Sequence, residues 1–520
     1  MSQTFRKSVL AMLVGSVVVG ANAAPTRLDE AASKAVQTNP DVVAKWHQFR
    51  ASAFERDTTW GRYLPTLDVL FGAGYQRQES PLFTERKYHF DTARATLRQN
   101  LFEGFGTVND TKRLEHASLV RFYETLDLSE SAAFEATRAY VDVWRYRKLV
   151  ALAEENYATH RVIYDKIKER ANAGVGRRVD LETAAGRLAL AESNLLTETA
   201  NLHDVTARYQ RIVGELPGDE MEAPPAILAK GLPKDRTEGI KTGFENSPQL
   251  KAAFENILSA KRNVEVQKAG YYPRVDAYLE SEHSENVNGY RPGFGSVTGT
   301  ASTNVQTAGV TVSWNLFRGN QDLNRQRRAA EEVNVAKDTR EKVCRDVRQN
   351  LETSYNDHLR LTEQLQYLDQ HQLSTDKARE AFRRQFDIGQ RTLLDVLDTE
   401  NEFYTARRNY VNGENDLLVS DARYLAASGN LLQTLNLKNL DMTPPRPETQ
   451  PDEDMLTTCP VQPVLPVVVD KEAIFKRALA KEELNRPQNL APAAPAAAEP
   501  AVTPGKPVTP APTGKRKAKP

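Results

Sequence analysis

This 520-residue sequence has few cysteines, no net excess of either charge and few long hydrophobic runs. Its two cysteines, Cys344 and Cys459, are too few for a disulfide framework or a cysteine-rich metal site. Eight scattered histidines show no metalloprotease spacing, which argues against a metalloenzyme. Lys and Arg number 69, as do Asp and Glu, and this balance argues against a nucleic-acid-binding protein. The mean hydropathy of −0.57 excludes a bundle of membrane-spanning helices, each of which needs about 20 mostly apolar residues.

Glycine and proline are absent from two long stretches, Thr107–Ala173 and Asn320–Ile388. Both stretches are rich in Ala, Leu, Glu, Arg, Lys and Gln, the residues that favour helices. They predict helices of roughly 100 Å each, because a helix rises 1.5 Å per residue. Their apolar residues form only a thin seam, so we expect a coiled-coil-like assembly with partner chains. Gly174 and Gly389 are the expected C-caps, each followed by a return helix.

The N-terminus has the three-part pattern of a secretory signal peptide. Arg6 and Lys7 precede the apolar run Val9–Val19, and Ala21-Asn22-Ala23 supplies an A-x-A cleavage site. We expect cleavage after Ala23 and export of the mature chain. The alternative is an uncleaved anchor, for which the apolar run is short. No cysteine follows the cleavage site, which disfavours a lipid-anchored form.

The sequence repeats itself at two constant offsets. One offset relates Asn39-Pro40 to Ser247-Pro248, and a slightly larger one relates Asn100–Gly104 to Asn315–Gly319. The larger offset also relates three single residues: Tyr140 to Tyr355, Gly174 to Gly389, and Asp180 to Asp395. An insertion between the two sets explains the change of offset. The chain therefore contains an internal duplication.

Each half also contains two segments in which apolar and polar residues alternate. These segments are Leu67–Tyr75 and Ala93–Leu101 in the first half, and Val275–Leu279 and Ala308–Leu316 in the second. Alternation with a period of two predicts strands, here about ten residues long. Polar loops near 77–89 and 282–305 are expected to join them. Each half thus supplies one hairpin.

Hairpins of this length with one apolar face suit a transmembrane β-barrel with a wet lumen. Arg94, Thr96 and Arg98 would then line the lumen. A hairpin of a soluble sandwich fits the same alternation, and periodicity alone leaves both alternatives open. The sequence does not decide whether the two arginines bias ion flow.

The C-terminal part has a different composition from the repeats. Residues 441–466 are rich in proline, 467–484 fit a short amphipathic helix, and 485–520 fit a disordered tail of mostly Ala, Pro, Thr, Val and Lys. The tail ends in a basic cluster, Lys515, Arg516, Lys517 and Lys519. We hypothesise that this cluster touches a cell-wall polymer or another anionic partner. A plain solvated tail is the alternative.

The signal peptide, the duplicated plan, the two Asn-Leu-Phe-x-Gly segments and the run Gly389–Asp398 together resemble the TolC family of outer-membrane channel proteins. The resemblance covers residues 27–437. It implies a membrane α+β fold: a homotrimer with a 12-stranded outer-membrane β-barrel, four strands from each chain, continued by a long periplasmic α-helical barrel. The expected divisions are a signal peptide (1–23), two TolC-like repeats (24–235 and 236–440), a linker with a short helix (441–484) and a disordered basic tail (485–520).

The candidate gate of such a channel is the turn at 386–398. Asp395 and Asp398 are three residues apart, so on a helix they share a face, and a trimer would form rings of carboxylates that favour cations. In the family, residues at this turn hold the periplasmic entrance shut. Carried over by position, these are Arg391, Asp395 and Asp398, with Asp180 on the matching first-half turn. We expect Arg391 to pair with Asp180 of a neighbouring helix, and a local Arg391–Asp395 surface pair is the alternative.

Two departures from the family pattern affect this gate. Phe386 stands where the best-known member has a tyrosine, so a hydroxyl link to Asp180 is not available. Arg177 and Arg178 precede Asp180 and add positive charge that can pair with the carboxylate rings instead. The closed aperture is therefore expected to be held in a different way.

The sequence contains no catalytic constellation, no P-loop and no metal-ligand cluster, so we expect neither an enzyme nor a cofactor. The resemblance implies a passive exit duct in outer-membrane lipid that docks with a periplasmic adaptor and an inner-membrane transporter of the ABC type. Because no lipoprotein cysteine is present, type I protein secretion is favoured over multidrug or small-molecule efflux. A structural periplasmic coiled coil is a further alternative. The sequence does not identify the exported substrate, and it gives no reason to expect that Cys344 and Cys459 meet.

Overall fold

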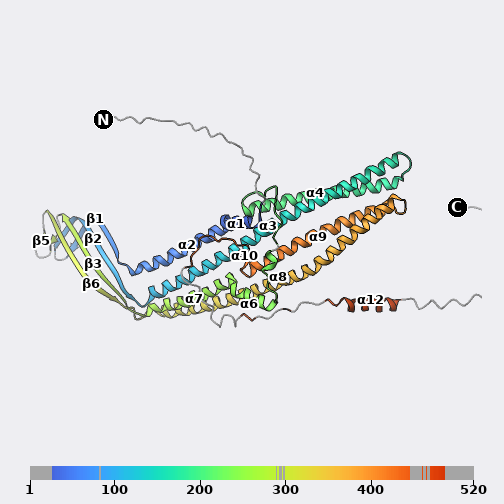
Figure 1. The fold of residues 1–520 in the computed structure, drawn as a ribbon. Coiled ribbons are helices and arrows are strands. Elements are labelled where there is room, and N and C mark those ends of the chain that lie inside the picture. The colour runs from blue at the N-terminus through green and yellow to red at the C-terminus, as the bar shows by residue number, and fades with distance from the viewer. Residues whose placement is uncertain are drawn as a thin grey trace, which may run out of the picture. The chain divides into compact units, whose positions relative to one another are not determined.

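A computed structural model describes the fold (Figure 1). The residues that it describes are 26–80, 83–225, 227–287, 290–291, 295–296, 299–444, 459–460, 464 and 469–485. The expected signal peptide and the basic tail beyond residue 485 lie outside the described residues, as does most of the proline-rich linker. The chain divides into two compact units, 1–464 and 465–520. The repeat and linker boundaries expected from the sequence stay a prediction.

The first unit contains the long helices and the sheet. Its first half has, in order, α1 (Leu28–Thr38), α2 (Pro40–Trp60), η1 (Gly61–Tyr63), β1 (Thr66–Ser80), β2 (Phe83–Glu103), α3 (Gly106–Asn172), α4 (Arg178–Val213), α5 (Ile227–Lys230) and α6 (Arg236–Asn246). Its second half has α7 (Pro248–Lys268), η2 (Ala269–Tyr271), β3 (Arg274–Val287), β4 (Tyr290–Arg291), β5 (Gly295–Ser296), β6 (Thr300–Ser313), α8 (Gln321–Asp387), α9 (Leu393–Ala427) and α10 (Leu431–Thr434). The second unit contains α12 (Lys471–Asn485), in the stretch for which the sequence predicts a short helix.

The repeated Asn-Pro and Ser-Pro motifs start equivalent helices. The Asn39 side-chain oxygen accepts a hydrogen bond from Asp41 N at 2.9 Å, and the Ser247 hydroxyl accepts one from Leu250 N at 3.5 Å. A proline follows each cap at the first helical position, where its missing N–H costs nothing. The motif therefore fixes the beginnings of α2 and α7.

The two glycine-free and proline-free stretches form the long helices, as predicted. Helices α3 and α8 each have 67 residues, and the return helices α4 and α9 have 36 and 35. Gly174 and Gly389 have φ angles of 74° and 79°, a left-handed conformation that glycine adopts without strain, so their predicted role at the helix ends is confirmed. Both turns lie at the end of the helices opposite the sheet (Figure 1). None of the described helices combines the length and apolarity that crossing a membrane requires.

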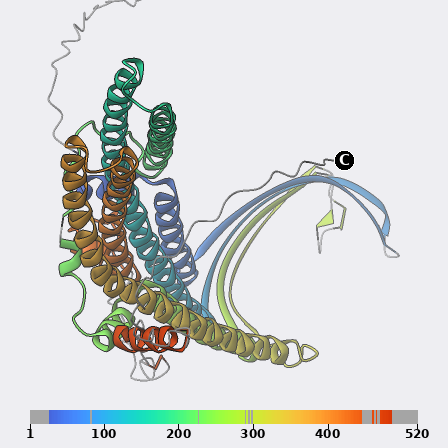
Figure 2. The ribbon, with the colours of Figure 1, turned by 90° about the vertical axis from the view of Figure 1, so that its right-hand side faces the viewer.

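The four main strands form one antiparallel sheet in the order β1-β2-β3-β6. Figure 2 shows that the sheet is strongly curved. Leu67, Val69 and Phe71 on β1 lie opposite Leu97, Ala95 and Ala93 on β2, so their side chains share one apolar face, which is exposed. The opposite face carries polar residues, including Arg94, Thr96 and Arg98.

The strands are longer than the ten residues predicted, and the predicted loops are correspondingly wrong. Strands β1 and β2 have 15 and 21 residues, and their pairing continues through Arg77↔Lys87, inside the expected 77–89 loop. Strands β3 and β6 have 14 residues each and pair as far as Val287↔Thr300, inside the expected 282–305 loop. At its other end β6 stops at Ser313, short of the expected Leu316. The ladder joins backbone groups, so it continues where the side chains become polar.

Both strand-to-helix junctions contain two consecutive left-handed residues. Gly104 and Phe105 precede α3 with φ angles of 63° and 62°, and Gly319 and Asn320 precede α8 with 60° and 61°. A Cβ at Gly104 would lie 2.7 Å from the carbonyl oxygen of Ala269, so this position admits only glycine. The glycine that ends each repeated Asn-Leu-Phe-x-Gly segment therefore lies in the sharp turn between a strand and a long helix.

The largest apolar core surrounds the middle of α3. It combines residues of α1, α3, the end of α4, α5, the end of α9 and α10. Tyr140 is fully buried there, and its hydroxyl lies 2.7 Å from the carbonyl oxygens of both Thr26 and Glu222. This core ties the N-terminal segment to both halves of the duplication.

A disulfide joins Cys344 on α8 to Cys459, with a Cα–Cα distance of 5.9 Å. Both residues are only 2% exposed. The sequence analysis left open whether these two cysteines meet, and the structure shows that they are bonded. The duplicated plan says nothing of Cys459, because this residue belongs to the extension after the second repeat, and the extension returns to α8.

Candidate functional site at the helix turns

The turn between α3 and α4 carries three of the predicted gate residues. Arg177 is the N-cap residue of α4 and Arg178 its first residue, and both are exposed. Asp180 lies in the first turn, is half-buried, and its N–H donates to the Arg177 carbonyl oxygen at 3.1 Å. Within the described part of this chain, none of the three side chains has a hydrogen-bond or ion-pair partner. Their expected contacts with a neighbouring chain stay a prediction.

Asp395 caps helix α9. Its carboxylate accepts hydrogen bonds from Thr392 N at 3.1 Å and from the Thr392 hydroxyl at 2.9 Å, and its own N–H donates to the Thr392 hydroxyl at 3.3 Å. These reciprocal bonds form a capping box. The hydrogen bonds from the side chain and backbone of Thr392, with the nearby Arg391, lower the pKa of Asp395. Asp395 therefore stays ionised and shapes the turn.

Arg391 is held by its own turn. Its Nε donates to Gln385 Oε1 at 3.0 Å, its guanidinium lies 4.4 Å from the centre of the Phe382 ring, and its Nη1 is 4.0 Å from Asp395 Oδ2. Within one chain the local pair with Asp395, the alternative left open by the sequence, is therefore present. A bond from Arg391 to Asp180 of another chain is not tested by these contacts.

Asp398 has a partner that the sequence did not suggest. Its carboxylate lies 2.5 Å from the guanidinium of Arg187 on α4, a contact between the two helical hairpins. Within one chain the Asp398 carboxylate is therefore paired, and the ring of carboxylates stays a prediction. No sequence pattern links the two residues, because α4 and α9 meet only in the folded chain.

Helix α9 is fastened to the first hairpin along much of its length. The further ion pairs are Arg407–Glu155 (2.7 Å), Arg408–Glu198 (2.8 Å), Lys148–Glu414 (3.1 Å) and Arg145–Asp416 (2.8 Å). Helix α8 is joined to α9 by His358–Asp421 (2.6 Å) and Arg383–Glu400 (2.5 Å). Helix α9 therefore connects α8 to the first hairpin.

Near the two turns, the helical hairpins α3–α4 and α8–α9 contact each other through an apolar cluster and, beside it, through buried polar residues. Phe386, a predicted gate residue, packs on a cluster formed by Ile167, Leu393 and Leu397. Next to it on the same helices, Glu400 is 4% exposed, and burial raises its pKa despite Arg383 and Arg379. His160 is 3% exposed, and burial, with Arg187 and Arg383, lowers its pKa. Phe386 thus packs in the apolar cluster at the turns, and its role at the aperture stays a prediction.

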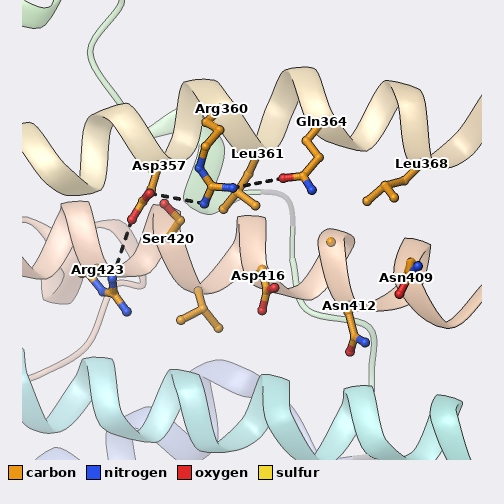
Figure 3. Close-up of a pocket in the computed structure, with 12 residues that line it drawn as sticks. Asp357, Arg360, Leu361, Gln364, Leu368, Asn409, Asn412, Asp416, Ser420 and Arg423 are labelled. Carbon is orange, nitrogen blue, oxygen red and sulfur yellow. Dashed lines mark hydrogen bonds and ion pairs between the residues drawn. The ribbon is translucent and has the colours of Figure 1, made fainter. Parts of the chain in front are cut away.

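A polar groove of about 540 Å³ lies between α8 and α9 (Figure 3). Arg360 bridges Asp357 at 3.3 Å and Gln364 at 3.0 Å, and Asp357 also lies 3.9 Å from Arg423. No pattern in the sequence predicts this groove, because its residues come from two separate helices. The Asp357 carboxylate is thus paired with two guanidinium groups, and Asp416, which also lines the groove, is paired with Arg145. Among the described residues, no cluster of three potential metal ligands occurs anywhere.

The polar face of the sheet carries its own ion pairs. Arg94 lies 2.6 Å from Glu282 on the neighbouring strand and 3.9 Å from Glu280, which also accepts a hydrogen bond from Thr96 at 3.3 Å. Arg94 and Glu282 are directly opposite each other in the register. The charge of Arg94 is therefore balanced within the chain.

A curved sheet with an exposed apolar face, continued by helices of 67 residues, defines an outer-membrane channel with a long helical extension. The family model described as "Outer membrane efflux protein" matches residues 31–215 and 240–430, and the chain belongs to this family. The predicted fold class, one chain's four-stranded share of a trimeric barrel with long periplasmic helices, is confirmed. The protein is an outer-membrane exit duct and not an enzyme.

Named proteins resemble the chain over most of its length. The outer membrane efflux protein BepC of Brucella suis is 24% identical over 64% of this chain and 71% of its own length. The proteases secretion protein PrtF of Dickeya chrysanthemi is 24% identical over 75% of this chain and 86% of its own. The crystal structure of the outer membrane protein VceC from Vibrio cholerae shares the fold, with a TM-score of 0.65 and 14% identity over 78% of this chain and 96% of that one.

Proposed function

We propose that the protein is the exit duct of a type I protein secretion system. The observation that carries this proposal is the similarity to PrtF, whose name states that it serves the secretion of proteases, over 86% of that protein's length. The energy would come from an inner-membrane transporter of the ABC type, linked to the duct by a periplasmic adaptor. Multidrug or small-molecule efflux is the second candidate, favoured by the similarity to BepC.

The proposed assembly is a homotrimer. Strands β1 and β6 form the two edges of the sheet, and each edge carries a row of backbone N–H and C=O groups. In a bilayer such groups must be paired, which only a closed barrel achieves. Pairing β6 of one chain with β1 of the next closes the sheet. Native mass measurement of the detergent-extracted protein should give three chains, and a monomer would contradict this assembly.

The cargo is tested by deleting the gene in its own organism. If the duct serves type I secretion, the deletion strain loses specific proteins from the culture medium but keeps its resistance to dyes and detergents. If it serves efflux, the secreted proteins stay and intracellular dye accumulates. Complementation with the intact gene is the control, and an unchanged secretome together with increased dye accumulation would overturn the proposal.

We further propose that the aperture is held by Arg187–Asp398 within a chain and by contacts between chains that involve Asp180, Arg391 and Asp395. The Arg187–Asp398 distance of 2.5 Å supports the first contact. The exposure of Arg177 and Arg178, beside the half-buried Asp180, leaves the α3–α4 turn accessible to a neighbour. Phe386 would close the seam by apolar packing.

Single-channel conductance in planar bilayers tests this gate. Arg187→Ala and Asp398→Ala should each raise conductance, because each variant releases α9 from α4 at the turn. The double variant Arg391→Ala with Asp395→Ala should raise it as well. Arg161→Ala is a matched control, since it breaks an exposed pair of 3.0 Å with Asp165 on α3 alone. Unchanged conductance in all the gate variants would remove the assignment.

A further inference from the structure

Three described residues of the C-terminal extension, Cys459, Pro460 and Val464, contact successive turns of α8. Cys344 is bonded to Cys459, Arg348 Nη1 donates to the Pro460 carbonyl oxygen at 3.2 Å, and Glu352 Oε1 accepts from Val464 N at 3.0 Å. Residues 344, 348 and 352 are each four apart, so they form one stripe on the helix. Cys459, Pro460 and Val464 therefore contact α8 at intervals of about one turn.

A second helix holds the end of this segment. Arg236 of α6 donates through Nη1 to the Val464 carbonyl oxygen and lies 3.5 Å from Glu352. Both charged side chains are nearly buried, with 13% and 10% of their surface exposed. Their carboxylate and guanidinium each bond the backbone of Val464 as well as each other. Without Val464, these two groups would lose hydrogen bonds in a poorly solvated place.

The other end of the segment is apolar. Cys459 is 2% exposed and belongs to a cluster with Ile240 and Phe244 of α6, Cys344, Val347, Leu351 and Tyr355 of α8, and Tyr424 of α9. At Gly243 a Cβ would lie 2.5 Å from Leu351, so α6 and α8 approach closely here. The segment thus lies against two helices that already form one packed surface.

We propose that Cys459, Pro460 and Val464 are the anchor points of an oxidation-dependent strap that attaches the C-terminal extension to the α6–α8 surface of its own chain. The family match ends at residue 430, so the strap is an addition to the shared fold. Its covalent link forms when the Cys344 and Cys459 thiols lose two protons and two electrons to a dithiol–disulfide oxidant of the periplasm, whose own disulfide becomes two thiols. The polar contacts at Arg348, Glu352 and Arg236 hold the strap in register.

Val464, the last residue of the first unit, lies beside Glu352 of α8 and Arg236 of α6. The inference does not depend on which cargo the duct exports.

Thiol counting on the full-length protein in isolated outer membranes tests the covalent link. The membranes are denatured in a maleimide reagent with and without prior reduction. We expect no labelled thiol before reduction, two afterwards, and a single-chain band on a non-reducing gel. Free thiols would overturn the proposal, and so would disulfide-linked multimers, which would mean that the strap docks on another copy.

A cleavable variant tests the docking itself. A protease site replaces residues 448–454, and retention of the C-terminal fragment on the purified channel is measured after cleavage. The fragment should stay until reductant is added. In a Cys459→Ser background it should dissociate at least about tenfold faster when Arg348→Ala and Glu352→Gln are added, since hydrogen bonds to two charged groups are lost. Equal dissociation with and without these two changes would overturn the docking register.

Discussion

Helices α3 and α8 occupy equivalent places in the duplication and have 67 residues each, yet they differ sharply in burial. More than twice as many residues of α3 as of α8 are buried within the chain. Helix α3 packs against α1, α2, α4, α7 and α9, whereas α8 packs mainly against α6, α7 and α9. Helix α3 is therefore an interior helix of the chain and α8 an edge helix.

The duplication therefore preserved the length of the two helices and the residues of their turns, but not how deeply the helices are buried. The exposed face of α8 includes large apolar side chains: Leu323, Val335, Leu359, Tyr367 and Leu373. In a closed ring an edge helix meets the first half of the next chain. In the proposed homotrimer, α8 would therefore bury more apolar surface than the thin seam noted in the sequence. The disulfide reinforces this less buried helix.

The largest expected effect comes from removing that reinforcement. Cys344→Ser with Cys459→Ser opens a cross-link with a sequence separation of 115 residues. A loop of this size corresponds to about 5 kcal/mol in the chain-entropy account of disulfides, an upper value if the unfolded chain retains structure. We expect a clearly lower melting temperature, measured by circular dichroism. The reduced wild-type protein is the matched control, and an unchanged melting temperature in both would contradict the prediction.

The repeated tyrosines give the next largest difference. Tyr140→Phe leaves the carbonyl oxygens of Thr26 and Glu222 without a hydroxyl that lies 2.7 Å from each, and we expect a loss of about 1–3 kcal/mol. Tyr355→Phe removes one hydrogen bond of 3.3 Å to the Lys234 carbonyl oxygen, and we expect less than about 1 kcal/mol. Chemical denaturation of both variants measures the two values. An equal loss would mean that the two halves are equivalent in stability after all.

The buried carboxyl of Glu130 on α3 makes stability depend on pH, and among the described residues of α8 no carboxyl has a pKa raised in this way. It is 4% exposed, and burial raises its pKa to about 8 although it accepts hydrogen bonds from Leu431 N and Leu432 N. A carboxyl with a raised pKa in the folded state stabilises the protein below its unfolded pKa, and this contribution is lost as the pH rises through 8. Glu130→Gln should remove this part of the decline between about pH 5 and 8. Melting curves across that range measure it, and parallel curves for the two proteins would refute it.

The smallest effects are expected at exposed local pairs. Arg161→Ala on α3 and Arg391→Ala beside α9 each break a surface pair four residues apart. Each should change stability by less than about 0.5 kcal/mol. A large loss of stability for Arg391→Ala alone would indicate that this residue also bonds another chain. Melting temperatures of the monomeric and the assembled protein would show whether the contact lies between chains.

Local signals account for what the sequence predicted well. The absence of glycine and proline between Thr107 and Ala173 is sufficient to specify a long helix, and Gly174 is sufficient to end it. The strand lengths were underestimated because polar residues such as Arg77 and Lys87 continue the backbone ladder without an apolar signal. The helices, their ends and the cores of the strands are therefore determined by the residues within or next to each element.

Contacts between distant segments could not be predicted in the same way. Arg187 and Asp398 carry no mark in the sequence that distinguishes them from the many other charged residues on amphipathic helices. Cys459 lies outside the duplication, so the repeat gave no guide to its partner. The capping role of Asp395, in contrast, can be predicted from the sequence, because a threonine three residues before a carboxylate at a helix start is a local motif.

The left-handed junctions at Gly104-Phe105 and Gly319-Asn320 have a geometric consequence for the whole wall. Each strand of the sheet continues into one helix, since α2 and α7 lead into β1 and β3, and β2 and β6 lead into α3 and α8. Neighbouring strands lie about 4.8 Å apart and packed helices about 10 Å, so four of each would cover roughly 19 Å and 40 Å of circumference. Strand tilt recovers only part of the difference. The perimeter of the wall must therefore widen at the level of these junctions. A bulkier residue at Gly104 would change the diameter of the duct at this level first.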